Sequence, residues 1–164
     1  MLSGGVYRCI VVGFDGSDAS RHAVGRAVGL ARALGSRLVL VTVVAPPTVF
    51  LGELLVPEVV DLSAVVEPAK KQLEALAREI RETTGVEAEP VILMGDPADE
   101  LVSYAEENGC DLIVVGRRGR GGLERLILGS VSSKIVSISH RVDVLVVESA
   151  SAKEKKEKEG KGEK

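Results

Sequence analysis

The fold is decided by residues 9–44, which read CIVVGFDGSDASRHAVGRAVGLARALGSRLVLVTVV. This stretch begins and ends with apolar runs, Cys9–Phe14 and Leu38–Val44, that show almost no polar alternation. Such runs are typical of strands covered on both faces of a parallel sheet. Between them, apolar residues recur at helical spacing up to Gly35, which stands where a helix C-cap is expected. The stretch therefore predicts a strand, a helix and a second strand. The apolar stripe of the helix consists of Ala23, Ala27, Leu30, Ala31 and Leu34.

The rest of the chain repeats this arrangement of helix and strand. A second helix is predicted around the stripe Leu73, Leu76, Ala77 and Ile80, with Glu67 and Pro68 in its first turn and Gly85 at its end. Two more helices are predicted from Pro97 to Gly109 and from near Ser130 to near His140. The remaining strands are predicted at Val91–Met94, Leu112–Val115 and Val142–Val147.

The alternation of strands and helices predicts an α/β fold. With right-handed crossovers it gives a three-layer α/β/α, doubly wound, five-stranded parallel sheet, for which we expect the strand order 3-2-1-4-5. In this order the direction of winding reverses between strands one and four. Ligands bind such sheets in the crevice outside the carboxyl ends of the strands at this reversal. The loops after strands one and four are therefore the expected site.

Composition and charge favour one domain with a charged tail. The chain has 164 residues, of which 45% are hydrophobic and 2% aromatic, so one aliphatic core is expected. The net charge is −3, but residues 151–164 hold six Lys and four Glu and leave −5 on the body. We expect a domain at 1–149 and a disordered tail at 150–164. The acidic body and the scarcity of aromatic residues argue against nucleic-acid binding.

The two cysteines give no sign of a metal or redox site. Cys9 and Cys110 stand at the start of one predicted strand and at the step into another, where Cys usually behaves as a small hydrophobic residue. No CxxC motif or Cys/His ligand spacing is present. The sequence also lacks a signal-peptide pattern and an apolar run of about 20 residues. A cytoplasmic protein is expected.

Two glycine-containing loops stand at the predicted crevice. Gly13–Asp18 follows strand one, and Gly116–Gly122 follows strand four, with Gly129–Ser133 opening the next helix. Glycine lets a phosphate approach the backbone, and free amides at a helix N-terminus point at the anion. The loops match neither a Walker A motif, because Gly122 and Leu123 stand where Lys and Ser/Thr are needed, nor the dinucleotide GxGxxG motif. The pattern therefore indicates a phosphate site of another type.

The spacing Gly116-x2-Gly119-x9-Gly129-Ser130 resembles the phosphate and ribose motif of the ATP-binding branch of the universal stress protein (UspA-like) family. Met94-Gly95-Asp96-Pro97 is similar to the turn after that family's third strand, and the resemblance covers roughly residues 6–148. It implies a Rossmann-like fold, of the kind found in adenine nucleotide alpha hydrolase-like proteins, and a role in the stress response.

The resemblance also implies a set of nucleotide contacts. Asp15 and the backbone of Val43 would hold the nucleoside end. Gly116 and Gly119 would let the backbone pass close to the ribose and phosphates, and Gly129 would open the helix. The Ser130 hydroxyl and the amides of Ser130 and Val131 would bind phosphate oxygens, with a contribution from Ser132. No catalytic and no metal-ligating residue is implied.

One departure from the family pattern concerns the loop between the first two motif glycines. Small or polar residues and a His commonly fill these positions in the family, whereas this chain has Arg117 and Arg118, followed by Arg120 after Gly119. These guanidinium groups could pair with a triphosphate, or they could point into solvent. The sequence leaves the two possibilities open.

The preferred function is a regulatory module that binds ATP, ADP or AMP, with Mg²⁺ held mainly by phosphate oxygens, and that passes its state to an unknown protein partner. The alternatives are a slow ATPase or phosphotransferase, a nucleotide-free dimeric scaffold, and RNA binding through the arginine-glycine loop. An apolar last strand at the sheet edge, Val142–Val147, predicts a homodimer. The resemblance implies an antiparallel contact between these strands.

Overall fold

The computed structural model of the chain describes residues 5–46, 48–51, 54–57, 61–117 and 128–149. The predicted tail at 150–164 lies outside these ranges, and so do Arg118, Gly119 and Arg120 of the glycine-rich loop. Among the residues that are described, no helix is long and apolar enough to cross a membrane.

Five parallel strands form the main sheet, in the order β5-β2-β1-β6-β7. Counted along the main sheet, this is the order 3-2-1-4-5, so the predicted fold is confirmed. The reversal of winding falls between β1 and β6, as expected from the sequence. The strands are β1 (Cys9–Gly13), β2 (Arg37–Val44), β5 (Ala88–Met94), β6 (Leu112–Gly116) and β7 (Asp143–Val147).

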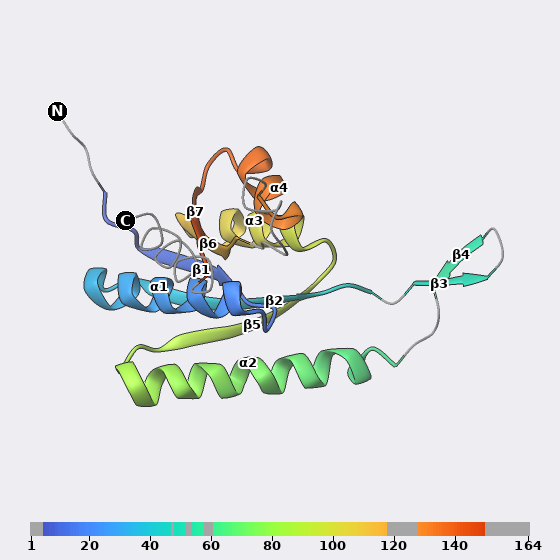
Figure 1. Cartoon of the computed structure of the whole chain (residues 1–164), viewed down its shortest axis with the longest axis horizontal. Coiled ribbons are helices and arrows are strands. Elements are labelled where there is room, and N and C mark those ends of the chain that lie inside the picture. Colours follow the sequence, from blue (N-terminus) through green and yellow to red (C-terminus); the bar gives the residue numbers. More distant parts are fainter. Residues whose placement is uncertain (1–4, 47, 52–53, 58–60, 118–127, 150–164) are drawn as a thin grey trace, which may run out of the picture.

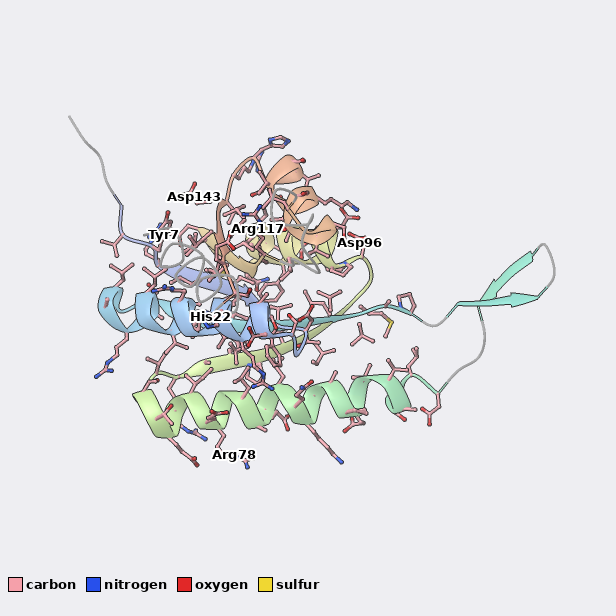
Figure 2. The ribbon with its side chains drawn as sticks, in the orientation of Figure 1. Tyr7, His22, Arg78, Asp96, Arg117 and Asp143 are labelled. Atoms are coloured by element: carbon pink, nitrogen blue, oxygen red, sulfur yellow. A yellow bond between two sulfur atoms is a disulfide. The ribbon has the colours of Figure 1, made fainter. Side chains whose placement is uncertain are left out.

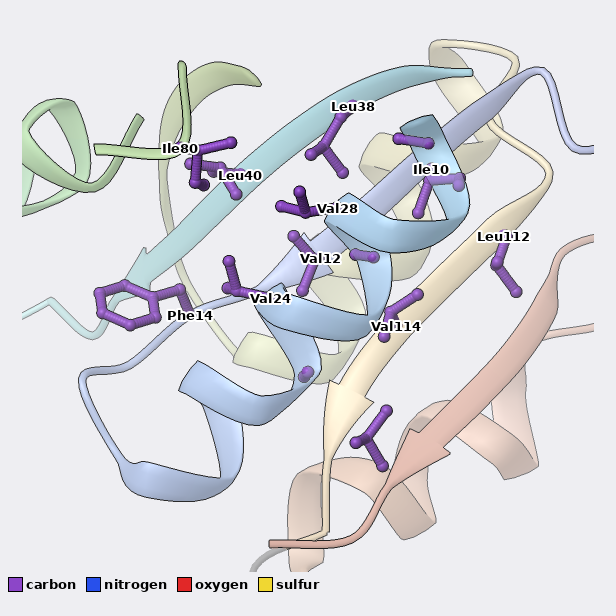
Figure 3. Packing of buried hydrophobic residues seen from close by; sticks show 14 of the residues in the cluster. Ile10, Val12, Phe14, Val24, Val28, Leu38, Leu40, Ile80, Leu112 and Val114 are labelled. Atoms are coloured by element: carbon purple, nitrogen blue, oxygen red, sulfur yellow. The ribbon is translucent and has the colours of Figure 1, made fainter. Parts of the chain in front are cut away.

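Helices cover both faces of this sheet and give the three predicted layers (Figure 1). The helices α1 and α2 pack on one face, and α3 and α4 pack on the other. Side chains along β1 alternate between the two cores, so that Ile10 and Val12 face α1 and Val11 faces α3. Figure 3 shows the first of these cores, where Val24 and Val28 of α1 lie over the sheet. The helices are α1 (Asp18–Leu34), α2 (Ser63–Thr84), α3 (Pro97–Glu107) and α4 (Ser130–Ile138).

Both ends of α1 are fixed by local sequence. The Ser17 side chain caps the helix by accepting a hydrogen bond from the Ser20 N–H at 3.2 Å. Gly35 ends it in the left-handed conformation, with φ 69°, and its N–H donates to the Ala31 carbonyl. The predicted C-cap is therefore confirmed, and the start of α1 lies directly beside the loop after β1.

The start of α2 differs from the sequence prediction. Glu67 and Pro68 were expected in the first turn, but the helix begins at Ser63 and contains Pro68. The earlier start is stabilised by Asp61, whose carboxylate accepts a hydrogen bond from the Ser63 N–H at 3.1 Å. Pro68 therefore lies in the second turn, where it removes one i→i−4 hydrogen bond of the helix. The predicted end at Gly85 is confirmed.

The interpretation of both cysteines as small hydrophobic residues was wrong, because Cys9 and Cys110 form a disulfide bond. Ile10 of β1 pairs with Leu112 of β6. This pairing brings Cys9, one residue before Ile10, and Cys110, two residues before Leu112, together with their Cα atoms 4.4 Å apart. The bond links the amino ends of the two strands whose carboxyl ends border the predicted crevice. Both residues are buried in the core under α3.

A β-hairpin between β2 and α2 was not predicted from the sequence. Its strands, β3 (Thr48–Leu51) and β4 (Leu54–Pro57), pair antiparallel and form a separate two-stranded sheet. The hairpin lies beyond the carboxyl end of β2, away from the main sheet (Figure 1).

Candidate functional site

A pocket of about 210 Å³ lies at the carboxyl ends of β1, β2 and β6, between the starts of α1, α3 and α4. This is the crevice at the reversal of winding, where the sequence predicted the site. Of the predicted contact residues, the pocket is lined by Asp15, Val43, Gly116, Gly129, Val131 and Ser132.

Two predicted contacts are not part of this lining. Ser130 begins α4 between Gly129 and Val131, but it is exposed and does not line the pocket. Gly119 lies outside the described residues. The structure therefore brings Asp15 and Val43 together with the start of α4, and their contacts with a nucleotide stay a prediction.

The loop after β1 holds Asp15 at the pocket by backbone hydrogen bonds. Its carboxylate accepts a bond from the Ser17 N–H at 2.9 Å, which is an Asx-turn. Gly16, between them, has φ 82°, a left-handed conformation that favours glycine. The Asp15 N–H donates to the Ser20 hydroxyl at 3.3 Å. The carboxylate is thus oriented by the same turn that starts α1.

The backbone of Val43 lies where β2 extends past the end of β1. The carbonyl of Val41 accepts a hydrogen bond from the Phe14 N–H at 2.8 Å, so the polar groups of Val41 point toward β1. In a parallel strand the polar groups of Val43 point the same way. The pairing of β1 with β2 ends at Gly13 and Val41, so β1 offers no further strand residue to Val43. These backbone groups therefore border the pocket.

The first turn of α4 presents backbone amides at the other side of the pocket. Its N-cap is Gly129, which makes no side-chain cap, whereas Ser17 and Asp96 cap α1 and α3 with their side chains. The first intrahelical bond runs from the Ser133 N–H to the Gly129 carbonyl at 2.9 Å. The earlier amides of the helix have no intrahelical partner, and together with the helix dipole they favour an anion.

The hydroxyl of Ser132 is engaged within α4. It is 2% exposed and donates to the Gly129 carbonyl at 3.1 Å. Its proton is therefore used inside the helix, and Ser132 can offer the pocket its backbone amide and its hydroxyl oxygen as an acceptor. The resemblance implies a contribution of Ser132 to phosphate binding, and its backbone amide is the group left to donate such a bond.

Gly116 has a reason to be glycine that the sequence did not reveal. A Cβ on Gly116 would lie 2.5 Å from the carbonyl carbon of Ala19, closer than atoms can approach without displacement. The residue lines the pocket, but its missing side chain is required by the packing of β6 against α1. Residue spacing along the chain gave no signal of this contact.

Arg117 is held at the end of β7 (Figure 2). Its guanidinium Nη1 lies 2.6 Å from Oε1 of Glu148, and its N–H donates to the Val147 carbonyl at 2.7 Å. The sequence left open whether this side chain points into solvent. It forms an ion pair, while Arg118 and Arg120 lie outside the described residues.

An ion-pair cluster joins the two helices that flank the pocket. Lys134 of α4 contacts the carboxylates of Asp96, the N-cap of α3, and of Asp99 in its first turn, each at 3.0 Å, and Figure 2 labels Asp96 at this junction. The bond from Lys134 and the backbone N–H of Asp99 lower the pKa of Asp96 below its ordinary value. Asp96 also caps α3, whose first residue, Pro97, lines the pocket.

Some residues of the pocket were missed in the sequence. They lie in elements that the sequence placed correctly, and the helical spacing of Pro97 and Leu101 was a usable signal for a shared inward face. The missed residues are Gly13, Phe14, Ser17, Ser20, Val41, Pro97, Leu101 and Val115.

In the described part of the chain, no group of three or more His, Cys, Asp or Glu is placed to hold a metal ion.

Comparison with protein families identifies residues 7–148 as a match to the universal stress protein family. The chain is 36% identical to the universal stress protein YxiE of Bacillus subtilis over 140 residues, covering 82% of this chain and 95% of that one. It is 34% identical to a universal stress protein of Methanocaldococcus jannaschii over 145 residues, covering 87% of this chain and 82% of that one.

Solved structures agree with this match. A universal stress protein UspA from Lactobacillus plantarum superposes with a TM-score of 0.71 at 25% identity, covering 88% of this chain and 99% of that one. A universal stress protein solved in complex with cAMP superposes with a TM-score of 0.67 at 29% identity, covering 89% of this chain and 100% of that one.

Proposed function

Because the chain belongs to the universal stress protein family, we propose that it binds an adenine nucleotide in the pocket at the ends of β1 and β6 and acts as a nucleotide-dependent regulator in the stress response. The observation that carries the proposal is the start of α4. It opens at Gly129 without a side-chain cap and faces the same pocket as Asp15 and Val43. A relative of the same fold, solved with cAMP, supports an adenine nucleotide as the ligand.

The pocket divides into a nucleoside side and a phosphate side. The carboxylate of Asp15 would accept hydrogen bonds from the nucleoside, and the backbone of Val43 would contact the base. The amides at the start of α4, from Ser130 to Ser132, would bind phosphate oxygens. The described walls enclose less than the roughly 300–1,000 Å³ of typical small-molecule sites, so they would surround part of a nucleotide.

A binding role is favoured over catalysis by the chemistry of the lining. Phosphoryl transfer needs positioned charge, a metal and a group that orients the nucleophile. Among the described lining residues, Asp15 supplies the carboxylate, and the others are apolar, glycine or serine residues. Mg²⁺ would be held mainly by phosphate oxygens. We therefore expect slow hydrolysis of ATP or none in the absence of a partner protein.

A homodimer through β7 is part of this proposal. The strand is at the edge of the sheet and pairs with β6 on one side, and Leu145 on it is 36% exposed. An exposed apolar edge is stabilised by pairing with another strand, and a second copy offers the same edge through a two-fold axis. Disulfides persist in oxidising compartments and in intracellular proteins of hyperthermophiles, so the cytoplasmic location stays a prediction.

Calorimetric titration with ATP, ADP, AMP, cAMP and GTP tests the proposed ligand class. We expect the adenine nucleotides to bind in one-to-one stoichiometry per chain and GTP to bind at least about tenfold more weakly, which corresponds to about 1.4 kcal/mol. Phosphate release from ATP, measured in parallel, should stay below one turnover per minute. Equal affinity for GTP would contradict adenine recognition, and rapid turnover would favour the enzyme.

A further inference from the structure

Arg117, which directly follows the pocket residue Gly116, forms an ion pair with Glu148. The atoms Nη1 and Oε1 are 2.6 Å apart, and the two side chains are 24% and 40% exposed. The preceding residue, Gly116, lines the pocket, so the Cα of Arg117 is about 3.8 Å from a pocket residue. The cation therefore starts within reach of a ligand that extends out of the pocket.

The strand geometry places Arg117 on the same face of the sheet as the start of α4. The bond from the Arg117 N–H to the Val147 carbonyl continues the pairing of β6 with β7, so side chains still alternate between the two faces at this point. Arg117 thus shares a face with Val115, which lines the pocket and packs in the same core as Ile135 of α4.

The proposed nucleotide would extend its phosphates toward this position. Its nucleoside end would lie at Asp15 and Val43 and its first phosphate at the amides of α4. In this arrangement each additional phosphate would add negative charge outside the pocket, on the side where Arg117 follows β6. A guanidinium group binds phosphate oxygens bidentately, as it binds a carboxylate. Glu148 and a terminal phosphate are therefore alternative partners of Arg117.

We infer that Arg117 determines how strongly the protein distinguishes nucleotides by their number of phosphates, and that Glu148 is a positioning residue that competes with the phosphates for it. A triphosphate takes over the guanidinium group and releases Glu148 at the end of β7. A monophosphate leaves the ion pair intact. The inference rests on the proposed function, and it links the charge of the bound nucleotide to the strand that forms the proposed dimer edge.

The test compares the ratio of the dissociation constants of AMP and ATP in four proteins: wild type, Glu148→Gln, Arg117→Gln and the double variant. Glu148→Gln removes the charge of one partner of Arg117, so the ratio should rise about ten- to hundredfold, the range expected for a hydrogen bond between charged groups. Arg117→Gln leaves an unpaired carboxylate near the phosphates, so the ratio should fall below that of wild type. In the Arg117→Gln background, Glu148→Gln should raise the ratio less than it does in wild type.

A matched control is provided by Glu89→Gln. Glu89 pairs with Arg37 at 2.8 Å, and neither residue lines the pocket, so this variant should leave the ratio unchanged. Arg117→Lys keeps the charge but not the bidentate geometry and should give an intermediate ratio. If all nucleotides bind tightly and Glu148→Gln does not change the ratio of the AMP and ATP dissociation constants, this inference is overturned but the proposed function is not. Absence of any binding by wild type overturns both.

Discussion

Gly116, at the end of β6, lies against the backbone of Ala19 in the first turn of α1. A Cβ on Gly116 would be 2.5 Å from both the carbonyl carbon and the carbonyl oxygen of Ala19. This contact fixes the distance between the two loops that border the pocket, because Asp15 and Ser17 precede α1 and Arg117 follows Gly116. The site therefore depends on a backbone approach that only glycine allows.

Gly116→Ala should lower the free energy of unfolding by at least about 1–3 kcal/mol, the usual cost of overpacking, because the added Cβ meets backbone atoms. Urea denaturation followed by circular dichroism measures the change. The control is Gly29→Ala on α1, where an added Cβ meets nothing within 4 Å. This control should gain about 0.5–1 kcal/mol, since glycine is unfavourable inside a helix. Unchanged stability of Gly116→Ala would show that β6 and α1 can separate at no cost.

Reduction of the disulfide should destabilise the protein without unfolding it. Cys9 and Cys110 are 101 residues apart in sequence, and a crosslink that closes so long a loop stabilises by about 2–5 kcal/mol. Urea denaturation with and without dithiothreitol should differ by this amount. Cys9→Ala with Cys110→Ala is the control, and its stability should not respond to dithiothreitol. If the stability of wild type also does not respond to dithiothreitol, the disulfide bond does not contribute to the free energy of unfolding.

The charge of Asp96 should stabilise the protein only above acidic pH. Its pKa is lowered in the folded state, first by the bond from Lys134. Its contribution is therefore fully present above the unfolded pKa of about 3.9 and is lost as the pH falls through the lower folded pKa. Asp96→Asn retains a capping oxygen and removes the charge. The melting temperatures of both proteins are measured between pH 7 and pH 2.5. Wild type should melt at a higher temperature than the variant at pH 7, and this difference should close below pH 4, about where the unfolded carboxylate titrates. A difference in melting temperature that does not depend on pH would contradict this account.

Val144→Lys should weaken the proposed dimer by placing a charge on the edge strand β7. We expect the dimer dissociation constant in sedimentation equilibrium to rise at least about tenfold, equivalent to about 1.4 kcal/mol. Thr83→Lys, at an exposed position of α2, is the matched control and should leave it unchanged. A wild type that is monomeric at micromolar concentration would refute the dimer, and a dimer that tolerates Val144→Lys would place the interface elsewhere.

The sequence predicted the main sheet because its central strands β1, β2 and β6 are buried on both faces and therefore appear as nearly uninterrupted runs of Val, Ile and Leu. The ends of α1 and α2 were predictable for an equally local reason, since Gly35 and Gly85 adopt left-handed conformations. The start of α2 was not, because Pro68 is also favourable in a first turn. The disulfide requires knowledge of which strands are neighbours, and Cys9 and Cys110 show no local pattern.

Position at the strand ends predicted a site at the loops that contain Asp15 and Gly129, and the family resemblance added Val43; all three residues line one pocket. The particular interactions depend on tertiary contacts that spacing does not encode. Ser132 donates its proton within α4, and Arg117 pairs with a residue 31 positions away. Such partners are known only once the register of β6 and β7 is known.

The central claim is that the start of α4, whose N-cap Gly129 has no side chain to cap the helix, binds the phosphates of an adenine nucleotide. Gly129 has φ −55° and ψ 156°, which any residue can adopt, so Gly129→Val should fold normally while its side chain occupies space that the phosphates need. Gly29→Val, at an open position of α1, is the matched control.

Calorimetric titration of ATP into the three proteins, each with a folded circular dichroism spectrum, is the most direct measurement. The account predicts that wild type and Gly29→Val bind ATP with the same affinity and that Gly129→Val binds at least about a hundredfold more weakly, equivalent to about 2.7 kcal/mol. Binding of ATP by Gly129→Val as tightly as by wild type would contradict it.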